Sequence, residues 1–283
     1  MINIAIAGFG NVGKALYQLA KNQPNVRLSH LFSSRKLNVE EKTYTYDQIE
    51  QAEKVDCVLL GLSSHNQLPS LAKEFLKTTC TIDCFDDTDN FDNFKALQQL
   101  TAVEHNKVAL CGCGWDPGIF DVARKLFLPL GKVETSWGKG TSCGHSNAVR
   151  NVDGVVDGVS WTIPTSIGHV RQVFVLANGD KKEIEQEIKN IPHYFSGLET
   201  NVVFVDKKQM DLIKKDFSHQ GKVWFENTYH KGHLSFSMQD NPLFTATIMF
   251  NSIPLALDRY HKKAFGAYTL CDLPLKNFGN FTV

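Results

Sequence analysis

Apolar and polar positions along the first third of the chain predict buried parallel strands joined by helices. Residues 2–7 form a near-continuous apolar run, which is typical of a strand buried on both faces. Residues 12–20 follow with helical spacing, since their apolar side chains fall on one side. Further apolar runs predict strands at 26–32, 55–62, 80–85 and 108–113, with a short helix at 68–76.

The pattern changes after about residue 118. A helix is predicted at 119–128, and β-rich segments follow at 161–164, 170–177, 202–205 and 223–238. Two polar amphipathic helices, near 182–190 and 207–216, lie between them. This mixture predicts an α+β second domain on an open, mostly antiparallel mixed sheet, and the apolar spacing at 243–259 predicts a helix that returns to the first domain.

The first predicted strand runs directly into a glycine motif. Residues Gly8, Phe9, Gly10, Asn11, Val12 and Gly13 match the G-x-G-x-x-G pattern between a strand and a helix. Gly8 permits a tight turn, Gly10 lets a pyrophosphate approach the backbone, and Gly13 lets helix and strand pack closely. The alternative is an ordinary glycine-rich turn. We therefore expect an α/β fold with an N-terminal Rossmann domain over 1–118, completed by about 243–283, and a second domain over 119–242.

The residues after the second strand indicate which dinucleotide binds. An NAD enzyme usually places a carboxylate there for the ribose hydroxyls. This chain has Ser33, Ser34, Arg35 and Lys36 instead, and hydroxyls with cations suit the 2′-phosphate of NADP. The alternative is a solvated basic turn. Ser63, Ser64 and His65 follow a later strand, where they either contact the cofactor or cap the next helix.

Composition narrows the function classes. Lys+Arg and Asp+Glu balance at 30 each, so no global field attracts nucleic acid or anionic lipid. No apolar run approaches the roughly 20 residues that span a bilayer, and we expect no membrane association. Seven cysteines, an odd number, favour reduced thiols in the cytoplasm over a disulfide framework. The Cys111-Gly112-Cys113 spacing fits no standard zinc set, so no metal site is predicted.

Several strings, in order along nearly the whole chain, match one family. The chain resembles meso-diaminopimelate dehydrogenase, an NADP-dependent enzyme acting on the D-centre of meso-2,6-diaminopimelate. The resemblance rests on the following strings: Gly8–Gly13 with Ser33–Arg35, Thr81–Asp86, Gly114–Gly118, Trp137–Gly140, Gly144–Ser146, Thr162–Pro164, Arg171–Gln172, Gly232–His233, and Asn241–Pro242 with Phe244–Ala246. Gly-Trp-Asp-Pro-Gly and the Trp-Gly-x-Gly…Gly-His-Ser pair are much more specific than the glycine fingerprint.

The resemblance implies a reversible oxidative deamination that yields L-2-amino-6-oxopimelate (tetrahydrodipicolinate) and ammonia, in lysine biosynthesis. It also implies a homodimer formed through the second domain. Asp86 and Asp116 are the expected acid/base groups at the D-centre amine. Otherwise Asp116 caps a helix starting at Pro117, and Asp86 is a turn residue. Trp115 and Trp137 are expected to wall the pocket, or else to be core aromatics.

The far end of the substrate requires its own contacts. Arg171 can hold a carboxylate in a fork, with Thr162 and His233 as further donors, and Asn241 can accept from the L-centre ammonium. Without the resemblance, Arg171 and Thr162 would be an ordinary partly exposed pair. His145 and the backbone N–H groups of Cys143 and Gly144 are expected near the D-carboxylate, although His145 could simply sit beneath its turn.

Three departures from the family pattern leave other functions open. Cys143 stands where members usually carry Gln or Met, Asn90 where some carry Asp, and the link between Thr162 and Arg171 is short. An altered pocket would favour an NADP-dependent dehydrogenase or imine reductase of another amino acid. A non-catalytic NADP-sensing protein is the third possibility, since a fold alone does not establish activity.

Overall fold

The computed structural model describes residues 1–281 and divides the chain into two compact units. The first unit comprises residues 1–122 and the chain from Pro242 onward, and the second comprises residues 123–241. The first part of this unit ends at Val122, whereas the sequence predicted a boundary at residue 118. The unit resumes at Pro242, close to the predicted residue 243. Helices α4 (Ile119–Phe127) and α8 (Asn241–Asn251) contain the two boundaries.

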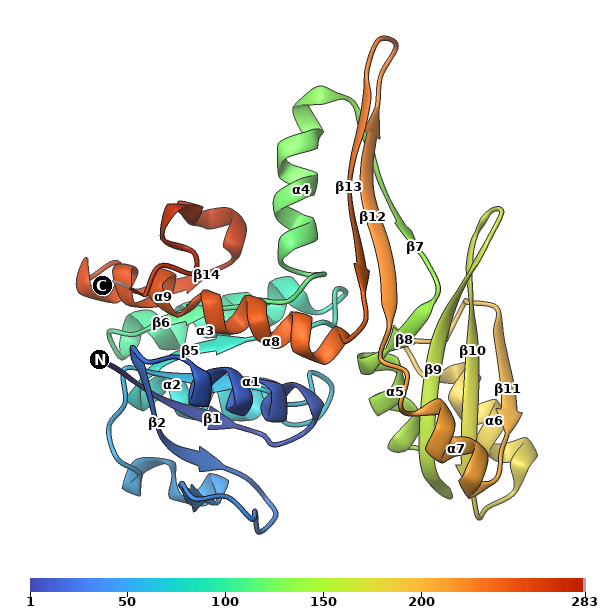
Figure 1. The fold of residues 1–283 in the computed structure, drawn as a ribbon, viewed down its shortest axis with the longest axis horizontal. Helices are drawn as coiled ribbons and strands as arrows, with labels where there is room; N and C mark the ends of the chain where they lie inside the picture. The colour runs from blue at the N-terminus through green and yellow to red at the C-terminus, as the bar shows by residue number, and fades with distance from the viewer. Residues whose placement is uncertain (282–283) are drawn as a thin grey trace. The chain divides into compact units, whose positions relative to one another are not determined.

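The first unit is built on a seven-stranded parallel sheet of order β14-β6-β5-β4-β1-β2-β3 (Figure 1). The order 3-2-1-4-5-6 within it is that of a Rossmann fold, whose ligand crevice lies where the order reverses, between β1 and β4. β14 extends this sheet with a strand from the end of the chain. The strands are β1 (Ile2–Ala7), β2 (Val26–Phe32), β3 (Lys42–Tyr44), β4 (Cys57–Leu60), β5 (Cys80–Asp83), β6 (Val108–Leu110) and β14 (Gly266–Tyr268).

Helices cover both faces of this sheet, because its central strands are buried on both sides. On one face, α2 (Leu68–Thr78) and α3 (Phe91–Glu104) pack against each other and on β5 and β6. They bury an apolar cluster that includes Phe75, Phe85 and Phe94. Helix α1 (Asn11–Asn22) packs on β1 and β2, and α9 (Ile253–His261) packs on β4, β5 and β6. Short 3-10 turns lie at Tyr46–Gln51, Leu270–Asp272 and Leu275–Asn277.

The second unit contains two sheets (Figure 1). One has the order β11-β10-β9-β8, antiparallel except for the parallel β10–β11 pair, and the other is the antiparallel set β13-β12-β7. Their strands are β7 (Lys132–Trp137), β8 (Gly140–Ser142), β9 (Val155–Thr165), β10 (Gly168–Ala177), β11 (Thr200–Phe204), β12 (His219–Glu226) and β13 (Lys231–Met238). The predicted α+β class with a mixed sheet is confirmed, but the strands divide into two sheets.

The division between the sheets occurs at Gly138-Lys139-Gly140, where the chain leaves β7 and enters β8. A Cβ at Gly140 would lie 2.3 Å from the Cα of His219, so only glycine lets β8 pass this close to the start of β12. Three helices complete the unit: α5 (Cys143–Arg150), α6 (Lys181–Asn190) and α7 (Lys207–Ile213). An apolar cluster from α5, α6 and β10, including Val149, Val173 and Ile188, forms its core.

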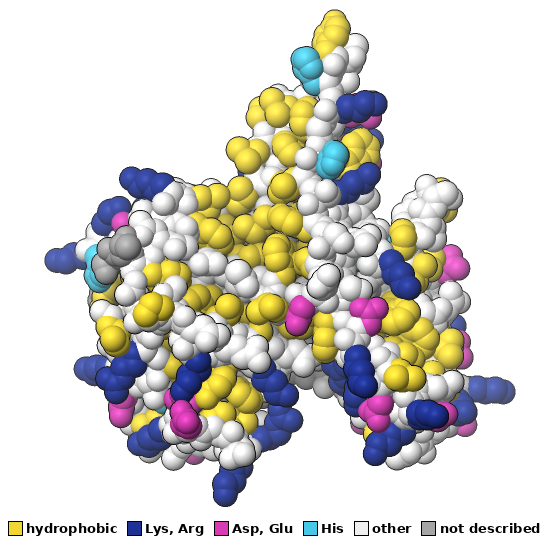
Figure 2. Space-filling view, in the orientation of Figure 1, with side chains coloured by type: hydrophobic (Ala, Val, Ile, Leu, Met, Phe, Trp, Pro, Cys, Tyr) yellow, Lys and Arg dark blue, Asp and Glu magenta, His cyan; other side chains and the backbone are white. Residues whose placement is uncertain are grey.

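Hydrophobic side chains are exposed over the outer part of α4 and the 3-10 turn Leu128–Leu130 that follows it (Figure 2). Leu126 and Leu128 are 64% and 65% exposed. Such a patch is typical of an interaction surface. Among residues 1–281, no helix is long and apolar enough to cross a membrane.

Candidate active site

The glycine motif forms a tight turn between β1 and α1. Gly8 has φ +90°, and a Cβ there would lie 2.5 Å from the carbonyl oxygen of Gly61. A Cβ at Gly13 would lie 2.0 Å from the carbonyl oxygen of Gly8, which explains the close helix–strand approach. Gly10 differs, since a Cβ there would meet no atom within 4 Å. The turn therefore presents open space beside Gly10, where the sequence predicts that a pyrophosphate binds.

The first turn of α1 faces this space with backbone donors. Gly10 is the N-cap residue and has no side chain to bond the free N–H groups, and Gly10 and Asn11 are exposed. Val12 follows in the first turn, and Phe9 packs edge-on against Tyr17 at 5.6 Å between ring centroids. A helix N-terminus of this kind favours anionic phosphate.

The turn after β2 is basic and ordered by Ser33. The Ser33 hydroxyl is buried and accepts a hydrogen bond from the backbone N–H of Arg35 at 3.0 Å. Ser34, Arg35 and Lys36 are exposed. Exposed hydroxyl and cationic groups at this strand end are suited to a ribose phosphate.

The acidic residues nearest along the chain, Glu40 and Glu41, already have partners. The Lys21 ammonium lies 3.1 Å from Glu40 and 2.8 Å from Glu41, and the Tyr17 hydroxyl donates to Glu41. The hydrogen bonds from Lys21 and Tyr17 outweigh burial and lower the pKa of Glu41. Both carboxylates are therefore paired with Lys21.

Ser64 links the carboxyl ends of β4 and β5. Its hydroxyl accepts from the Asp86 backbone N–H at 3.1 Å. Burial raises the pKa of Asp86, while Ser64 and, more weakly, His65 lower it. The alternative was that these side chains cap the next helix. At Ser63 the backbone carbonyl, and not the side chain, accepts the hydrogen bond from Leu68 N–H. Ser64 and Asp86 thus belong to one cluster beside the switch point of the sheet.

Trp115 and Asp116 lie in the turn after β6, the strand next to β5. Trp115 is buried and packs on Phe120 at 5.3 Å between ring centroids, whereas Asp116 is half-buried. Helix α4 begins at Ile119, and the Asp121 carboxylate accepts from Gly118 N–H at 2.9 Å. A helix starting at Pro117 and capped by Asp116 is therefore not observed.

The turns that carry Asp86 and Asp116 are tied together by Asp83, a residue that was not predicted. Oδ1 of Asp83 accepts from the N–H groups of Phe85 at 3.0 Å and Gly112 at 2.9 Å. Its side chain is fully buried, and burial raises the pKa of Asp83 to about 6. The predicted buried strand at 80–85 contained this residue, but nothing in the sequence indicated its hydrogen bond to the turn at Gly112. Asn90, nearby, donates to Asp87 at 2.8 Å.

In the second unit, Arg171 and Thr162 form a buried pair. They are direct cross-strand partners in β10 and β9, and the guanidinium donates to the Thr162 hydroxyl. Arg171 is 8% exposed, and burial lowers its pKa to about 10. Among residues 1–281, no carboxylate forms an ion pair with Arg171. The exposed alternative is thereby excluded, and the buried cation is suited to an anionic ligand.

His219, at the start of β12, is a candidate site residue that the sequence analysis missed. Its Nε2 lies 3.4 Å from the Thr162 hydroxyl, and burial lowers the pKa of His219 to about 4. Trp137 lies edge-on to the same imidazole, at 6.1 Å between ring centroids. The sequence carried little signal for His219, because the strand was predicted to begin only at residue 223, whereas β12 begins at His219.

His233 is separated from this pair. His219 is opposite Met238 in the β12–β13 ladder, and His233 is opposite Trp224, five residue pairs or about 16 Å farther along. Because successive side chains of a strand alternate between the two faces, a separation of five residues places His233 on the opposite face from His219, where it is exposed. The structure thus brings His219, and not His233, to Thr162.

The predicted residues Cys143, Gly144 and His145 form the first turn of α5. The N-cap residue Ser142 makes no side-chain cap; its hydroxyl lies 2.8 Å from Nδ1 of His145. Burial, and then Arg171, lowers the pKa of His145. The ring also lies edge-on to Tyr194, at 4.9 Å between ring centroids. This helix start is therefore a neutral, donor-rich turn near Arg171.

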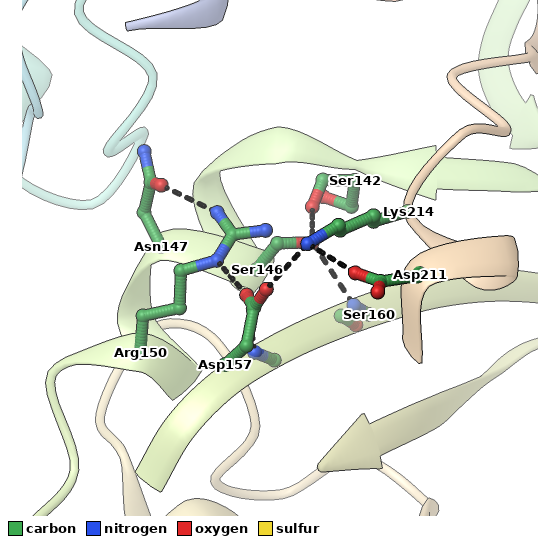
Figure 3. A network of polar contacts seen from close by, with 9 residues as sticks. Ser142, Ser146, Asn147, Arg150, Asp157, Ser160, Asp211 and Lys214 are labelled. Carbon is green, nitrogen blue, oxygen red and sulfur yellow. Dashed lines mark hydrogen bonds and ion pairs between the residues drawn. The ribbon is translucent and has the colours of Figure 1, made fainter. Parts of the chain in front are cut away.

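Helix α5 is held in place by hydrogen bonds at each end (Figure 3). Ser146 donates to the Ser142 carbonyl at 2.6 Å and accepts from Ser160 N–H at 2.9 Å, which joins the helix to β9. At the other end, Arg150 bonds Asp157 at 2.9 Å, and Lys214 of the α7 segment lies 3.6 Å from the same carboxylate. The network positions the first turn of α5 on the four-stranded sheet.

Asn241 is buried at the end of the second unit. Its Nδ2 donates to the Thr141 carbonyl at 3.3 Å and lies 3.9 Å from Sγ of Cys143. This contact orients the amide relative to the start of α5. The structure therefore gathers Cys143, His145 and Asn241 near one end of the sheet that carries Thr162 and Arg171.

The cysteines at the strand ends behave as buried thiols. Burial raises the pKa of Cys80 to about 11, and it also raises the pKa values of Cys57, Cys111 and Cys113. Within the part of the chain that the structure describes, no three His, Cys, Asp or Glu residues group as metal ligands.

One family model matches mainly the second unit, and relatives match nearly the whole chain. The family model for the diaminopimelic acid dehydrogenase C-terminal domain matches residues 114–168 and 165–239. Meso-diaminopimelate D-dehydrogenase of Acetivibrio thermocellus is 32% identical, over 96% of this chain and 92% of that protein. The enzyme of Corynebacterium glutamicum is 31% identical, over 87% and 85%.

Solved structures agree with these relatives. An engineered D-amino acid dehydrogenase bound to NADP+ matches with a TM-score of 0.92 and 26% identity, over 99% of this chain and 96% of that one. The Corynebacterium glutamicum diaminopimelate dehydrogenase in complex with diaminopimelate matches with a TM-score of 0.91 and 28% identity, over 99% and 96%. The chain belongs to the meso-diaminopimelate D-dehydrogenase family.

Proposed function

We propose that this chain is an NADP-dependent dehydrogenase that oxidatively deaminates the D-centre of meso-2,6-diaminopimelate to L-2-amino-6-oxopimelate and ammonia, reversibly. The proposal rests mainly on the environment of Arg171. Its buried guanidinium pairs with Thr162 and has no carboxylate partner among the described residues. A buried cation without an acid partner is costly unless a ligand supplies the anion. The far carboxylate of a diamino dicarboxylic acid is such an anion.

The first unit fits NADP. The open space at Gly10 and the uncapped start of α1 suit the pyrophosphate, and the exposed Ser34, Arg35 and Lys36 suit the 2′-phosphate. When bound, NADP accepts the hydride from the D-centre carbon, which is chemistry that no protein side chain can supply.

The reaction also requires a proton acceptor. The substrate ammonium must lose a proton before its lone pair can form the C=N bond, and a nearby carboxylate can bind the ammonium and take that proton. Asp86 and Asp116 follow neighbouring strands and are assigned this role. The raised pKa of Asp86 favours proton uptake nearer to neutral pH. Water then adds to the imine carbon, and ammonia leaves to give the oxo product.

The second unit is assigned the carboxylates and the L-centre amine. Arg171, Thr162 and His219 supply donors for the far carboxylate, and the Asn241 amide oxygen accepts from the L-centre ammonium. The N–H groups of Cys143 and Gly144, at the start of α5, are suited to the D-carboxylate. Trp115, next to Asp116, and Trp137, edge-on to His219, are assigned to keep water away from these two side chains.

Association and location are part of the proposal. The exposed leucines of the α4 region support a homodimer formed through the second unit. Sedimentation at several concentrations tests it, because Leu126→Glu and Leu128→Glu together would shift a dimer toward monomer. A reduced-thiol composition supports a cytoplasmic location.

The experiment that tests the function follows NADPH absorbance with a panel of amino acids at alkaline pH. Turnover of meso-diaminopimelate with none of the L,L isomer is expected. Turnover of another D-amino acid in its place would indicate that Cys143 and the short β9–β10 link have changed the substrate. NADPH binding with no turnover of any amino acid would indicate an NADP sensor.

The assigned carboxylates give a sharper test. Asp86→Asn and Asp116→Asn keep the shape but lose the proton acceptor, so each should lower kcat/KM at least about tenfold. Asp92→Asn, an exposed position on α3, is the matched control. Near-native kcat/KM in both variants would contradict the assigned role.

A further inference from the structure

His169 lies on the same face of the four-stranded sheet as Arg171. The two residues are two positions apart in β10, so their side chains point to one side. Across the ladder, His169 is opposite Pro164 and Arg171 is opposite Thr162. The intervening link is a short hairpin in which Thr165 pairs with Gly168. The compact hairpin therefore places an imidazole beside the Arg171–Thr162 pair.

Two polar atoms on this face are buried without partners. Among the described residues, His169 Nε2 and Arg171 Nε make no hydrogen bond. A buried donor left unsatisfied is destabilising by about 1–3 kcal/mol, so a ligand group that accepts hydrogen bonds from Nε2 of His169 and Nε of Arg171 would be stabilising on this face.

The electrostatic surroundings indicate what that ligand is. Burial, followed by Arg171, lowers the pKa of His169, and His169 in turn lowers the pKa values of His145 and His219. The geometry agrees with these effects, because the Thr162 hydroxyl contacts both Arg171 and Nε2 of His219, and His169 lies on the same face of β10 as Arg171. No carboxylate contributes to any of the four shifts. With its pKa at about 10, Arg171 is the charged group of the four at neutral pH, and it attracts an anion and repels a cation, while the neutral imidazoles can donate hydrogen bonds.

We infer that His169 donates a hydrogen bond through Nε2 to the far carboxylate of the substrate, beside Arg171, and so helps the second unit select a dicarboxylate. This inference rests on the proposed function, since it takes the far end of diaminopimelate as the ligand. Nε2 of His169 can donate in the neutral Nε2–H tautomer or when protonated.

D-lysine is the matched probe for this contact. It has the same D-centre and the same far amine as meso-diaminopimelate, but it lacks the far carboxylate. Binding of both compounds to wild-type protein and variants is measured by calorimetry with NADPH present and ammonia absent, which prevents turnover. NADPH formation is followed separately as the assay of the proposed function.

Loss of a hydrogen bond to a charged group corresponds to a change in Kd of about tenfold or more. His169→Leu should therefore raise the Kd and KM for meso-diaminopimelate at least about tenfold, with kcat changed less than KM. The Kd for D-lysine should stay within about twofold. His169→Gln, which keeps an amide donor, should recover part of the affinity. His230→Leu, at an exposed histidine of the β12–β13 hairpin, is the matched control.

An unchanged Kd for meso-diaminopimelate in folded His169→Leu would overturn the inference. Equal losses for both compounds would also overturn it, because the far carboxylate would then not be the group recognised. Failure of the proposed function gives a different result, namely wild-type protein that forms no NADPH from meso-diaminopimelate. In that case, a selective loss of diaminopimelate binding in His169→Leu would still support the contact.

Discussion

Arg35 is the side chain whose role is most directly tied to the choice of dinucleotide. It is exposed, and its backbone N–H is fixed by the buried Ser33 hydroxyl, so the turn is ordered while the guanidinium can reach a ligand. Arg35→Ala removes a charge that can bind the 2′-phosphate in a fork. The KM for NADP should rise at least about tenfold, and that for NAD should hardly change.

Steady-state kinetics with both dinucleotides checks this expectation. Arg27→Ala, at an exposed position near the other end of β2, is the control. Equal effects of Arg35→Ala on NADP and NAD would remove the assignment.

Asp83 stabilises the loops that carry the assigned carboxylates, but its charge is unfavourable. Burial raises its pKa to about 6 from an ordinary 3.8, so the fold favours the protonated form. The contribution of Asp83 to the free energy of unfolding is therefore fully present below pH 3.8, and it is lost as the pH rises through 6. Asp83→Asn keeps an oxygen for the Phe85 and Gly112 N–H groups without the charge.

The free energy of unfolding of Asp83→Asn, relative to wild type, should therefore increase from pH 4.5 to pH 8, with a difference of up to about 3 kcal/mol at the higher pH. Urea titrations at the two values measure it. A difference that does not depend on pH would mean that the Asp83 carboxyl titrates normally in the folded protein.

At the scale of elements, β12 and β13 each contribute one histidine, and the sequence analysis named only the one in β13. His219 lies beside Thr162, and His233 is on the opposite face of the sheet. His219→Ala should raise the KM for meso-diaminopimelate about tenfold or more, since a donor to a carboxylate is removed. His233→Ala should change it less than twofold. Kinetics of the two variants decides between the residues, and the reverse order would contradict the structural assignment.

The elements also show how far the pattern of apolar residues could be followed. β1 and β2 have the predicted bounds, and both end where the apolar residues give way to the glycine turn at Gly8 and the polar turn at Ser33. Helix α3 was not predicted, since Leu97 and Leu100 are exposed while Gln98 and Thr101 are buried, which blurs the apolar stripe.

The segment at 243–259 was predicted as one helix, but it is two. α8 ends at Asn251, Ser252 is buried, and Pro254 lies in the first turn of α9. A proline removes one backbone donor and favours a helix start over a helix interior. Pro254 was visible in the sequence, but the apolar spacing continues across it and so predicted a single helix.

In the candidate site as well, the features that are local in the sequence could be predicted and those that depend on distant segments could not. The glycine turn, the basic turn and the strand-end carboxylates are local in sequence, and they were predicted. The position of His219 depends on how β12 aligns with β13 and approaches β9, and the role of Asp83 depends on the neighbouring turn at Gly112. Contacts between distant segments leave no periodic trace in a single sequence.

For the whole molecule, buried neutral histidines set the response to acid. Burial lowers the pKa values of His30 and His219 to about 4, and that of His145 below its ordinary value. Below pH 6.5 the unfolded chain binds protons that the native state does not. The stability that these residues contribute is present above pH 6.5 and is lost as the pH falls toward 4.

His30→Phe tests this response, because His30 lies edge-on between Phe32 and Tyr44 in the first unit and a phenyl ring suits that position. Wild-type protein should lose about 2 kcal/mol more free energy of unfolding than the variant between pH 6.5 and pH 5. Urea titrations at both values measure this, with the exposed His261→Phe as control. Identical losses in wild type and His30→Phe would show that His30 titrates normally.

The seventh strand of the first unit has a consequence for synthesis of the chain. β14 pairs with β6, and α9 packs on β4, β5 and β6, so the Rossmann sheet incorporates residues made after the whole second unit. Domains generally fold as units while the ribosome elongates the chain. The nucleotide-binding half, although it begins first, therefore reaches its native form last, and the inserted α+β half can complete its folding while the nascent first half is still waiting for its final segment.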